Sequence, residues 1–183
     1  MYPRNFKVNM INIDIKEVSG NDILKLQEIG RITFYETFSA SNSEENMVQY
    51  LKEGFSIQKL TGELNNYNSK FFFALDQKKV IGYLKLNFGD TQTELKDANA
   101  MEIERIYVLN EFQGKKVGQL LYDKAIEIAI ERKADYVWLG VWEENKRALN
   151  FYRKNGFLEF DKHIFKLGED EQTDIMMKLV LTK

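Results

Sequence analysis

The sequence predicts a mixed α/β fold (α/β or α+β), in which helices cover both faces of a central sheet. Segments with the two-residue alternation of strands and segments with helical periodicity succeed one another along the 183 residues. The stretch 136–142, YVWLGVW, is apolar on both faces, which is typical of a strand inside a covered sheet. A strand, a helix and this second strand follow one another between 101 and 142, which is the order of a parallel crossover.

The N-terminal half predicts one strand, three helices and a hairpin. Residues 13–18 alternate apolar and polar side chains, as a half-buried strand does. Ile23, Leu26 and Ile29 then recur at helical spacing, and Ser43 can cap a further helix. The expected elements are a strand at 13–18, helices at 22–38, 47–51 and 57–67, and a hairpin of 70–75 with 80–88.

The C-terminal half predicts a strand–helix–strand unit, a short helix and a final antiparallel pair. Val117, Leu121, Ala125 and Ile128 step by four, four and three residues and mark one buried helical stripe. Gly156 suits the left-handed residue that ends a helix. The expected elements are strands at 101–109 and 136–142, helices at 116–133 and 145–155, and paired strands at 157–167 and 175–181.

Composition limits the class of protein. With 44% apolar and 30% charged residues, the chain predicts one globular domain over 1–183, with a poorly patterned extension at 1–12. The net charge of −2 provides no basic field for nucleic acid or a membrane, and no apolar run approaches the roughly 20 residues of a membrane span. There is no cysteine and only one histidine, so no metal site is expected, and a reducing cytoplasm suits the chain.

The stretch 113–119, QGKKVGQ, stands at the first turn of the predicted crossover helix. A helix N-terminus has unpaired N–H groups and a partial positive charge, and glycine lets the backbone approach a ligand closely. Gly114 and Gly118, with Lys115 and Lys116 between them, therefore suit a phosphate. Glycine and lysine are also common in solvent-exposed loops that bind nothing. The nucleotide-binding motifs GxxxxGK[ST] and GxGxxG are absent from the sequence. The turn alone leaves both interpretations open.

A second polar feature follows the strand 136–142. Asn145, Ala148 and Tyr152 lie at offsets of zero, three and seven residues, and therefore on one stripe of the predicted helix. This stripe would place an amide and a phenol beside the phosphate turn. In the alternative interpretation, Asn145 only caps the helix and Tyr152 is a core aromatic residue.

Together these segments resemble the GNAT superfamily of N-acetyltransferases. The family signature N-x-x-A-x-x-F-Y-x-K-x-G-F is present in full from Asn145 to Phe157. The phosphate turn [QR]-x-x-G-x-[GA] is matched at Gln113 and Gly118, but Lys116 occupies its central glycine position. The stretches MEIERIYV, WLGVWEEN and GEDEQTDIMM look like the bacterial PaiA type, which acetylates spermidine and spermine.

The resemblance implies a twisted, mostly antiparallel sheet of about seven strands, with acetyl-CoA in the V between the two central parallel strands. It also implies that Asn145 holds the pantetheine arm, that the N–H of Val108 polarises the thioester carbonyl, and that Tyr152 protonates the departing thiolate. The cofactor-binding residues that it implies are Ile106, Tyr107, Val108, Gln113, Gly114, Lys115, Lys116, Val117, Gly118, Gln119, Asn145, Ala148, Tyr152 and Lys154.

The acceptor amine needs a group that removes a proton, because a primary amine has a pKa near about 10.4 and attacks only when neutral. Glu102 and Glu104 stand two apart on one predicted strand and point to the same face. Either could serve as the base or hold a cationic acceptor, with Glu104 favoured as the base, unless one of them only pairs with Arg105 or with a lysine at the rim of the sheet. The acidic turn GEDE, 168–171, is a solvated turn or part of the acceptor mouth, and His163 is expected to be a strand residue without a catalytic role.

The sequence thus favours an acetyl-CoA-dependent N-acetyltransferase that works by direct attack in a ternary complex, with spermidine or spermine as acceptor. Another amine or a protein N-terminus is the nearest alternative. A non-catalytic acyl-CoA-binding regulatory module is the other, because Lys116 could narrow the phosphate turn. The expected partners are acetyl-CoA and a small cationic amine, neither nucleic acid nor a membrane is expected, and a homodimer stays open.

Overall fold

The computed structural model describes residues 12–167 and 170–181. Residues 1–11 of the predicted extension, and Gly168 and Glu169 of the acidic turn, lie outside the described residues. The strands are β1 (Ile13–Glu17), β2 (Ser69–Asp76), β3 (Lys79–Phe88), β4 (Ala100–Val108), β5 (Tyr136–Trp142), β6 (Leu158–Leu167) and β7 (Asp170–Val180). The helices are α1 (Ile23–Phe38), α2 (Glu44–Gly54), α3 (Ile57–Asn65), α4 (Val117–Glu131) and α5 (Lys146–Lys154).

The predicted elements are all present, with shifted ends. The helix expected at 47–51 begins at Glu44, because the Ser43 side chain accepts a hydrogen bond from the backbone N–H of Asn46 at 3.2 Å. Gly156 follows α5 with φ 89°, which is the left-handed stop that the sequence predicted. The last strand begins at Asp170, five residues earlier than expected, because β6 and β7 pair along nearly their whole length.

The seven strands form one sheet in the order β1-β2-β3-β4-β5-β7-β6. Every neighbouring pair is antiparallel except β4 and β5, which are parallel and enclose the predicted crossover helix. β5 therefore lies inside the sheet, as its apolar sequence predicted, and β6 forms an edge.

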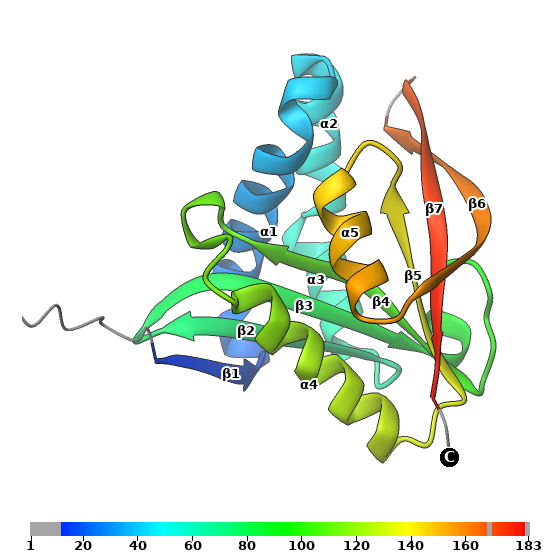
Figure 1. Cartoon of the computed structure of the whole chain (residues 1–183). Coiled ribbons are helices and arrows are strands. Elements are labelled where there is room, and N and C mark those ends of the chain that lie inside the picture. Colours follow the sequence, from blue (N-terminus) through cyan, green and yellow to red (C-terminus); the bar gives the residue numbers. More distant parts are fainter. Residues whose placement is uncertain (1–11, 168–169, 182–183) are drawn as a thin grey trace, which may run out of the picture.

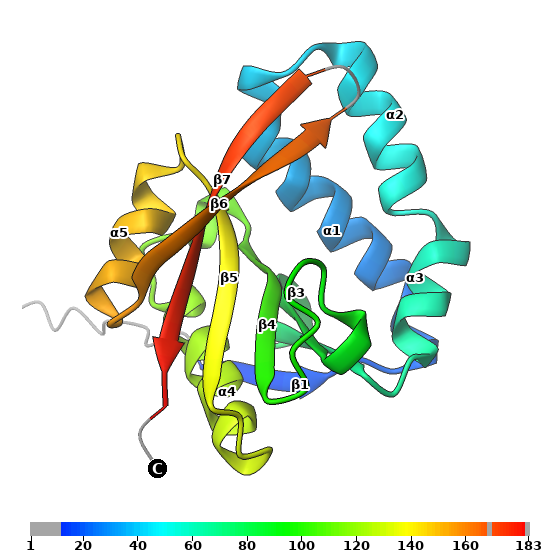
Figure 2. The same cartoon turned by 90° about the vertical axis from the view of Figure 1, so that its right-hand side faces the viewer.

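Helices cover both faces of the sheet. α4 and α5 lie on one face, and α1, α2 and α3 lie on the other (Figures 1 and 2). The predicted stripe of α4 is buried against β3 and β4, with Val117 and Leu121 at most 1% exposed.

The parallel strands separate soon after they meet. β4 and β5 pair only from Ala100 to Glu102 on one strand and from Tyr136 to Trp138 on the other. Beyond these residues the two strands diverge, and β4 faces a widening gap (Figure 1). The pairing of β3 with β4 also shifts register beside Glu104, which produces a β-bulge. The gap and the bulge together shape the candidate active site.

Candidate active site

The gap between β4 and β5 opens into a cavity of about 400 Å³, which we name the gap cavity. Its walls are the outer half of β4, the turn before α4, and α5. The predicted cofactor residues that line it are Ile106, Tyr107, Val108, Gln113, Gly114, Gly118, Asn145, Ala148 and Tyr152. The predicted residues outside this lining are Lys115, Lys116, Val117, Gln119 and Lys154. Of these, Val117 is buried in the core and the three lysines are exposed.

The edge of β4 presents a backbone donor to the gap cavity. The N–H of Leu109 donates to the carbonyl of Ile81 on β3 at 3.0 Å. Successive N–H groups of a strand point to opposite sides, so the N–H of Val108 points away from β3 and into the gap. The N–H of Ile106, two residues earlier, has the same orientation. An extended ligand could therefore pair with this edge as a further strand would.

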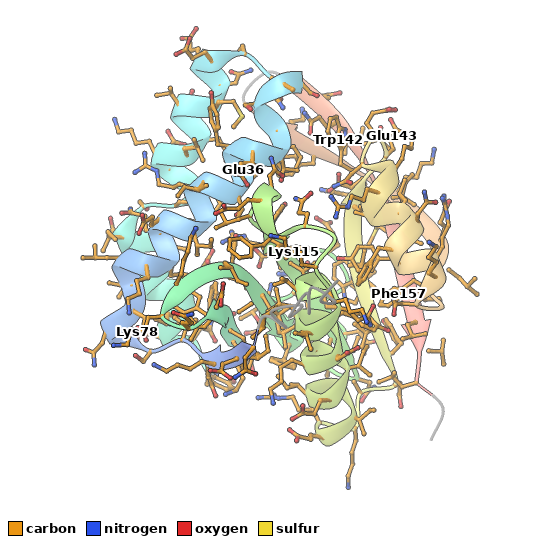
Figure 3. The ribbon with its side chains drawn as sticks, turned by 60° about the vertical axis from the view of Figure 1, so that its left-hand side comes forward. Glu36, Lys78, Lys115, Trp142, Glu143 and Phe157 are labelled. Carbon is orange, nitrogen blue, oxygen red and sulfur yellow. The ribbon has the colours of Figure 1, made fainter. Side chains whose placement is uncertain are left out.

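The turn before α4 adds further backbone donors. Gly114 has φ 78°, and Lys116, the N-cap residue of α4, has φ 66°, so both lie in the left-handed region. The N–H groups of Val117 and Gly118 precede the first intrahelical hydrogen bond of α4. Figure 3 shows Lys115 on this turn. The left-handed conformation of Lys116 explains why the family pattern has glycine at this position.

A polar bridge crosses the mouth of the gap cavity. The Gln113 side chain donates to the carbonyl of Val108 at 3.1 Å, and its Oε1 accepts a hydrogen bond from Arg147 of α5. Arg147 also lines the cavity, so a guanidinium stands close to the turn's backbone donors. This arrangement suits a phosphate group. The sequence analysis missed Arg147, because no motif assigned it a role and only the folded chain brings it to Gln113.

Two predicted residues of α5 have both structural and ligand-facing roles. Asn145 Oδ1 accepts from the N–H of Ala148 at 3.1 Å, so Asn145 caps α5 and also lines the gap cavity. Tyr152 is buried beside Phe151 and Phe157, with ring centroids 5.3 and 5.5 Å away. Burial raises the pKa of Tyr152 well above its ordinary value, so the phenol stays protonated and can act as a proton donor.

A second cavity, of about 250 Å³, lies on the face covered by α1 and α2, and we name it the acidic cavity. It shares Tyr107 and Trp142 with the gap cavity, so the two cavities meet at these side chains. Trp142 packs against Phe38 of α1, with ring centroids 5.7 Å apart. The polar and ionisable side chains in its lining are Tyr50, Thr93, Glu94, Glu102, Glu104, Arg105, Tyr107, Trp138, Trp142, His163 and Asp174.

Glu104 belongs to a buried cluster of ion pairs. Its carboxylate lies 2.6 Å from Lys85 Nζ and 3.0 Å from Arg105 Nη2, and Glu63 of α3 contacts both cations. Burial alone would raise the pKa of Glu104, but the charges of Arg105 and Lys85 outweigh it and lower this pKa to about 2. A carboxylate with so low a pKa rarely holds a proton near neutral pH, which counts against Glu104 as the base. The catalytic role of Glu104 stays a prediction.

Glu102 has a different environment on the same face of the sheet. Its carboxylate accepts hydrogen bonds from the Thr93 N–H at 2.8 Å, the Thr93 hydroxyl at 2.5 Å and Asn87 Nδ2 at 3.0 Å. Burial raises the pKa of Glu102, the hydrogen bonds from Thr93 and Asn87 lower it in part, and the negative charge of Glu104 adds to the rise. No cation contacts Glu102 among the residues that the structure describes, in contrast to Glu104.

Comparison with known proteins agrees with this architecture. The family model described as the Acetyltransferase (GNAT) family matches residues 31–157. The chain belongs to this family. The seven-stranded sheet with one parallel pair is the GNAT fold that the sequence predicted.

Two curated sequences and one solved structure are similar to this GNAT acetyltransferase over nearly its whole length. An uncharacterised N-acetyltransferase from Lactobacillus delbrueckii subsp. lactis is 41% identical over 94% of this chain and 99% of its own. The spermidine N(1)-acetyltransferase of Thermoplasma acidophilum is 28% identical over 92% and 97% of the two chains. The crystal structure of the PaiA N-acetyltransferase from Thermoplasma acidophilum, in complex with coenzyme A, matches with a TM-score of 0.76 at 26% identity over 93% and 99% of the two chains. N-acetyl transfer is thus the activity of the family, whereas the acceptor amine is a separate question.

The final hairpin of this acetyltransferase contributes two groups to the acidic cavity that the sequence analysis did not assign. His163 of β6 lies opposite Asp174 of β7 in the strand pairing, and its Nε2 is 3.3 Å from Glu94 Oε1. His163 is thus a strand residue with a partner, as predicted, but it also faces the cavity. Burial raises the pKa of Asp174 to about 6, and the nearby His163 opposes this rise in part. Only the antiparallel pairing of β6 and β7 brings these groups together.

Three further observations concern membrane-spanning helices, metal-binding groups and the predicted acidic turn. Within 12–167 and 170–181, no helix is long and apolar enough to cross a membrane. The same part of the chain holds no group of three or more acidic or histidine side chains arranged to bind a metal ion. Of the predicted acidic turn, Glu171 is exposed and pairs with Lys166 at 2.8 Å.

Proposed function

We propose that this acetyltransferase transfers the acetyl group of acetyl-CoA to a primary amine of a small cationic acceptor, with polyamines of the spermidine class as its substrates. The observation that carries the proposal is the junction of the two cavities at Tyr107 and Trp142. One cavity has the backbone donors that suit a phosphorylated, extended cofactor, and the other is lined by carboxylates. The identity to a spermidine N(1)-acetyltransferase supports the same acceptor class.

Acetyl-CoA fits the gap cavity by the chemistry of its lining. The pyrophosphate is proposed to bind the N–H groups of the turn at Gly114 to Gly118, with Arg147 beside them. The pantetheine arm is proposed to extend along β4, where Asn145 reaches it from α5. Lys115, Lys116 and Gln119 contribute through the backbone of the turn, whereas Lys154 is exposed and outside the lining.

The chemistry is proposed to be direct attack of the amine nitrogen on the thioester carbonyl carbon. The N–H of Val108 stabilises the negative charge that develops on the carbonyl oxygen. A carbon–nitrogen bond forms while the carbon–sulfur bond breaks, and Tyr152 gives its proton to the departing thiolate. The amine loses one proton before attack and one as the amide forms, so the acceptor needs a proton-accepting group nearby.

The two predicted glutamates divide into a structural and a substrate-binding role. Glu104 is neutralised by Lys85 and Arg105 and stabilises the bulge of β4. Glu102 has no cation partner among the described residues and is proposed to bind a positive charge of the acceptor. Its hydrogen-bond donors, Thr93 and Asn87, hold the carboxylate in place and offset part of the rise in pKa that burial causes, and an ammonium group beside it would favour its ionised form.

The non-catalytic alternative depended on Lys116. Its side chain is exposed and does not line the gap cavity, so it does not narrow the site. Tyr152 and the acidic cavity also have no evident purpose in a module that only binds acyl-CoA. The cytoplasmic location and the homodimer stay predictions.

An acceptor panel tests the proposed function. Release of free CoA from acetyl-CoA is measured with spermidine, spermine, a monoamine and a peptide with a free N-terminus. We expect turnover with the polyamines to exceed turnover with the monoamine and the peptide. If the peptide reacts while both polyamines are inert, the polyamine assignment fails and protein N-terminal acetylation replaces it.

A further inference from the structure

The acidic cavity contains a glycine in the middle of a buried strand. Gly140 lies between Trp138 and Trp142 on the cavity face of β5 and is the exposed residue of that strand. A Cβ atom at Gly140 would lie 3.5 Å from Asp174 Oδ2, so the missing side chain leaves space directly beside this carboxylate. Glycine inside a strand often marks a place where a ligand approaches closely.

Asp174 borders that space without a hydrogen-bond partner among the residues that the structure describes. It stands opposite Trp142 in the pairing of β5 with β7, and Trp142 also lines the gap cavity. Asp174 is therefore at the level where the two cavities meet. Its charge also acts on Tyr50 of α2 and Tyr107 of β4, which face the same space.

Glu102 lies in the same cavity, further along β5 from the point where the two cavities meet. It pairs with Trp138, whereas Asp174 pairs with Trp142, four residues further along β5. Four residues of a strand span roughly 13 Å, so the two carboxylates lie at well separated depths. Glu104 does not compete with them for a cation, because Lys85 and Arg105 already neutralise it.

We propose that Asp174 binds the reacting ammonium group of the acceptor and takes its proton, while Glu102 binds a second ammonium group deeper in the acidic cavity. This inference rests on the proposed function and assigns the two ends of its substrate. One proton passes from the nitrogen to the Asp174 carboxylate and then to solvent, and the neutral nitrogen attacks. The space at Gly140 admits the alkyl chain that joins the two charged groups.

The assignment explains why a diamine or polyamine suits the site better than a monoamine. A monoamine can satisfy only one carboxylate and leaves the other buried charge without a partner. The remaining ionisable side chains that face Asp174 are Tyr50, Glu94, Arg105, Tyr107 and His163. Among these, Glu94 and His163 pair with each other.

Kinetics of matched variants test the two assignments. Asp174→Asn and Glu102→Gln are compared with Asp161→Asn, which removes an exposed carboxylate of β6 outside the cavity. We expect Asp174→Asn to lower kcat for spermidine and for a monoamine by about 10²-fold or more, the scale of lost general base catalysis. It should also remove the fall of kcat/KM toward acid pH. Glu102→Gln should raise KM for spermidine, leave kcat nearly unchanged and leave the monoamine unaffected.

Binding measurements separate this inference from the proposed function. If the wild-type protein acetylates none of the amines, the proposed function fails, but spermidine can still be titrated into the CoA-loaded protein. We expect the affinity to fall at least about tenfold, or about 1.4 kcal/mol, in Asp174→Asn and to be unchanged in Asp161→Asn. Equal affinity in these two variants, or wild-type kcat and pH dependence in Asp174→Asn, overturns the role of Asp174. Gly140→Ala, whose Cβ makes only ordinary contacts, should raise KM for spermidine without unfolding the protein.

Discussion

Replacement of Asp174 by asparagine should stabilise the folded protein at neutral and alkaline pH, although it removes a proposed functional group. The carboxylate is half-buried beside Gly140, and none of the described residues donates a hydrogen bond to it. Its pKa rises from 3.8 to about 6 on folding, chiefly because burial disfavours the charged form. Asparagine has nearly the same shape and carries no charge.

The expected magnitude follows from linkage. A group whose pKa is raised on folding binds a proton more tightly in the folded state, so the folded state loses stability as pH rises from the unfolded to the folded pKa. An increase of about two units in the pKa of Asp174 lowers the free energy of unfolding by about 3 kcal/mol once the pH exceeds both the unfolded and the folded pKa. Solvent reaches part of this side chain and screens its charge, so we expect a gain of about 1–2 kcal/mol in the variant.

The assay is urea denaturation of the wild type, Asp174→Asn and the control Asp161→Asn. Asp174→Asn should exceed the wild type in free energy of unfolding at about pH 8, and the difference should shrink to nearly zero at about pH 3, below both pKa values, where both states hold the proton. The control should follow the wild type at both pH values. An Asp174→Asn variant that is less stable than the wild type at about pH 8 would refute the reasoning, because the carboxylate would then have a stabilising partner.

Three further predictions follow from the same structure. Lys85→Met should destabilise the fold by about 3–5 kcal/mol in urea denaturation, because it leaves Glu63 and Glu104 buried with less positive charge. Tyr152→Phe should lower kcat by about 10²-fold or more with unchanged CoA affinity, and unchanged turnover would exclude this proton donor. Lys116→Gly should raise stability by up to about 1 kcal/mol, since glycine tolerates φ 66°, and should leave CoA affinity similar; a large gain in affinity would show that the lysine obstructs the site.

Some site residues could be predicted from local pattern. Asn145 and Tyr152 share a helical stripe, and Gly114 stands at a helix N-terminus, so each position follows from the geometry of one element. The family resemblance then assigned them to a cofactor site, and the structure brings them to one cavity. Sequence alone could not distinguish Glu102 from Glu104, because alternation placed both on one face.

The difference in pKa between Glu102 and Glu104 arises from contacts with residues that lie far from them in the sequence. Lys85 of β3 pairs with Glu104 and also with Glu63 of α3, whereas Thr93 of the loop before β4 donates hydrogen bonds to Glu102. Asn87 of β3 donates to both carboxylates and does not distinguish them. The register shift at Glu104 is also a property of the pairing with β3 and has no signature within β4 itself. The pKa of each carboxyl group therefore depends on contacts that only the folded sheet creates.

The sequence by itself determined the elements, the mixed sheet, the interior position of β5 and the family, because each depends on periodicity or on a contiguous motif. The tertiary structure alone decided which carboxylates face the acceptor, how Arg147 meets Gln113, and that Asp174 stands beside Gly140 where the cavities join. These contacts join residues that are tens of positions apart in the chain. Their geometry is set by strand order and register, which local side-chain patterns do not encode.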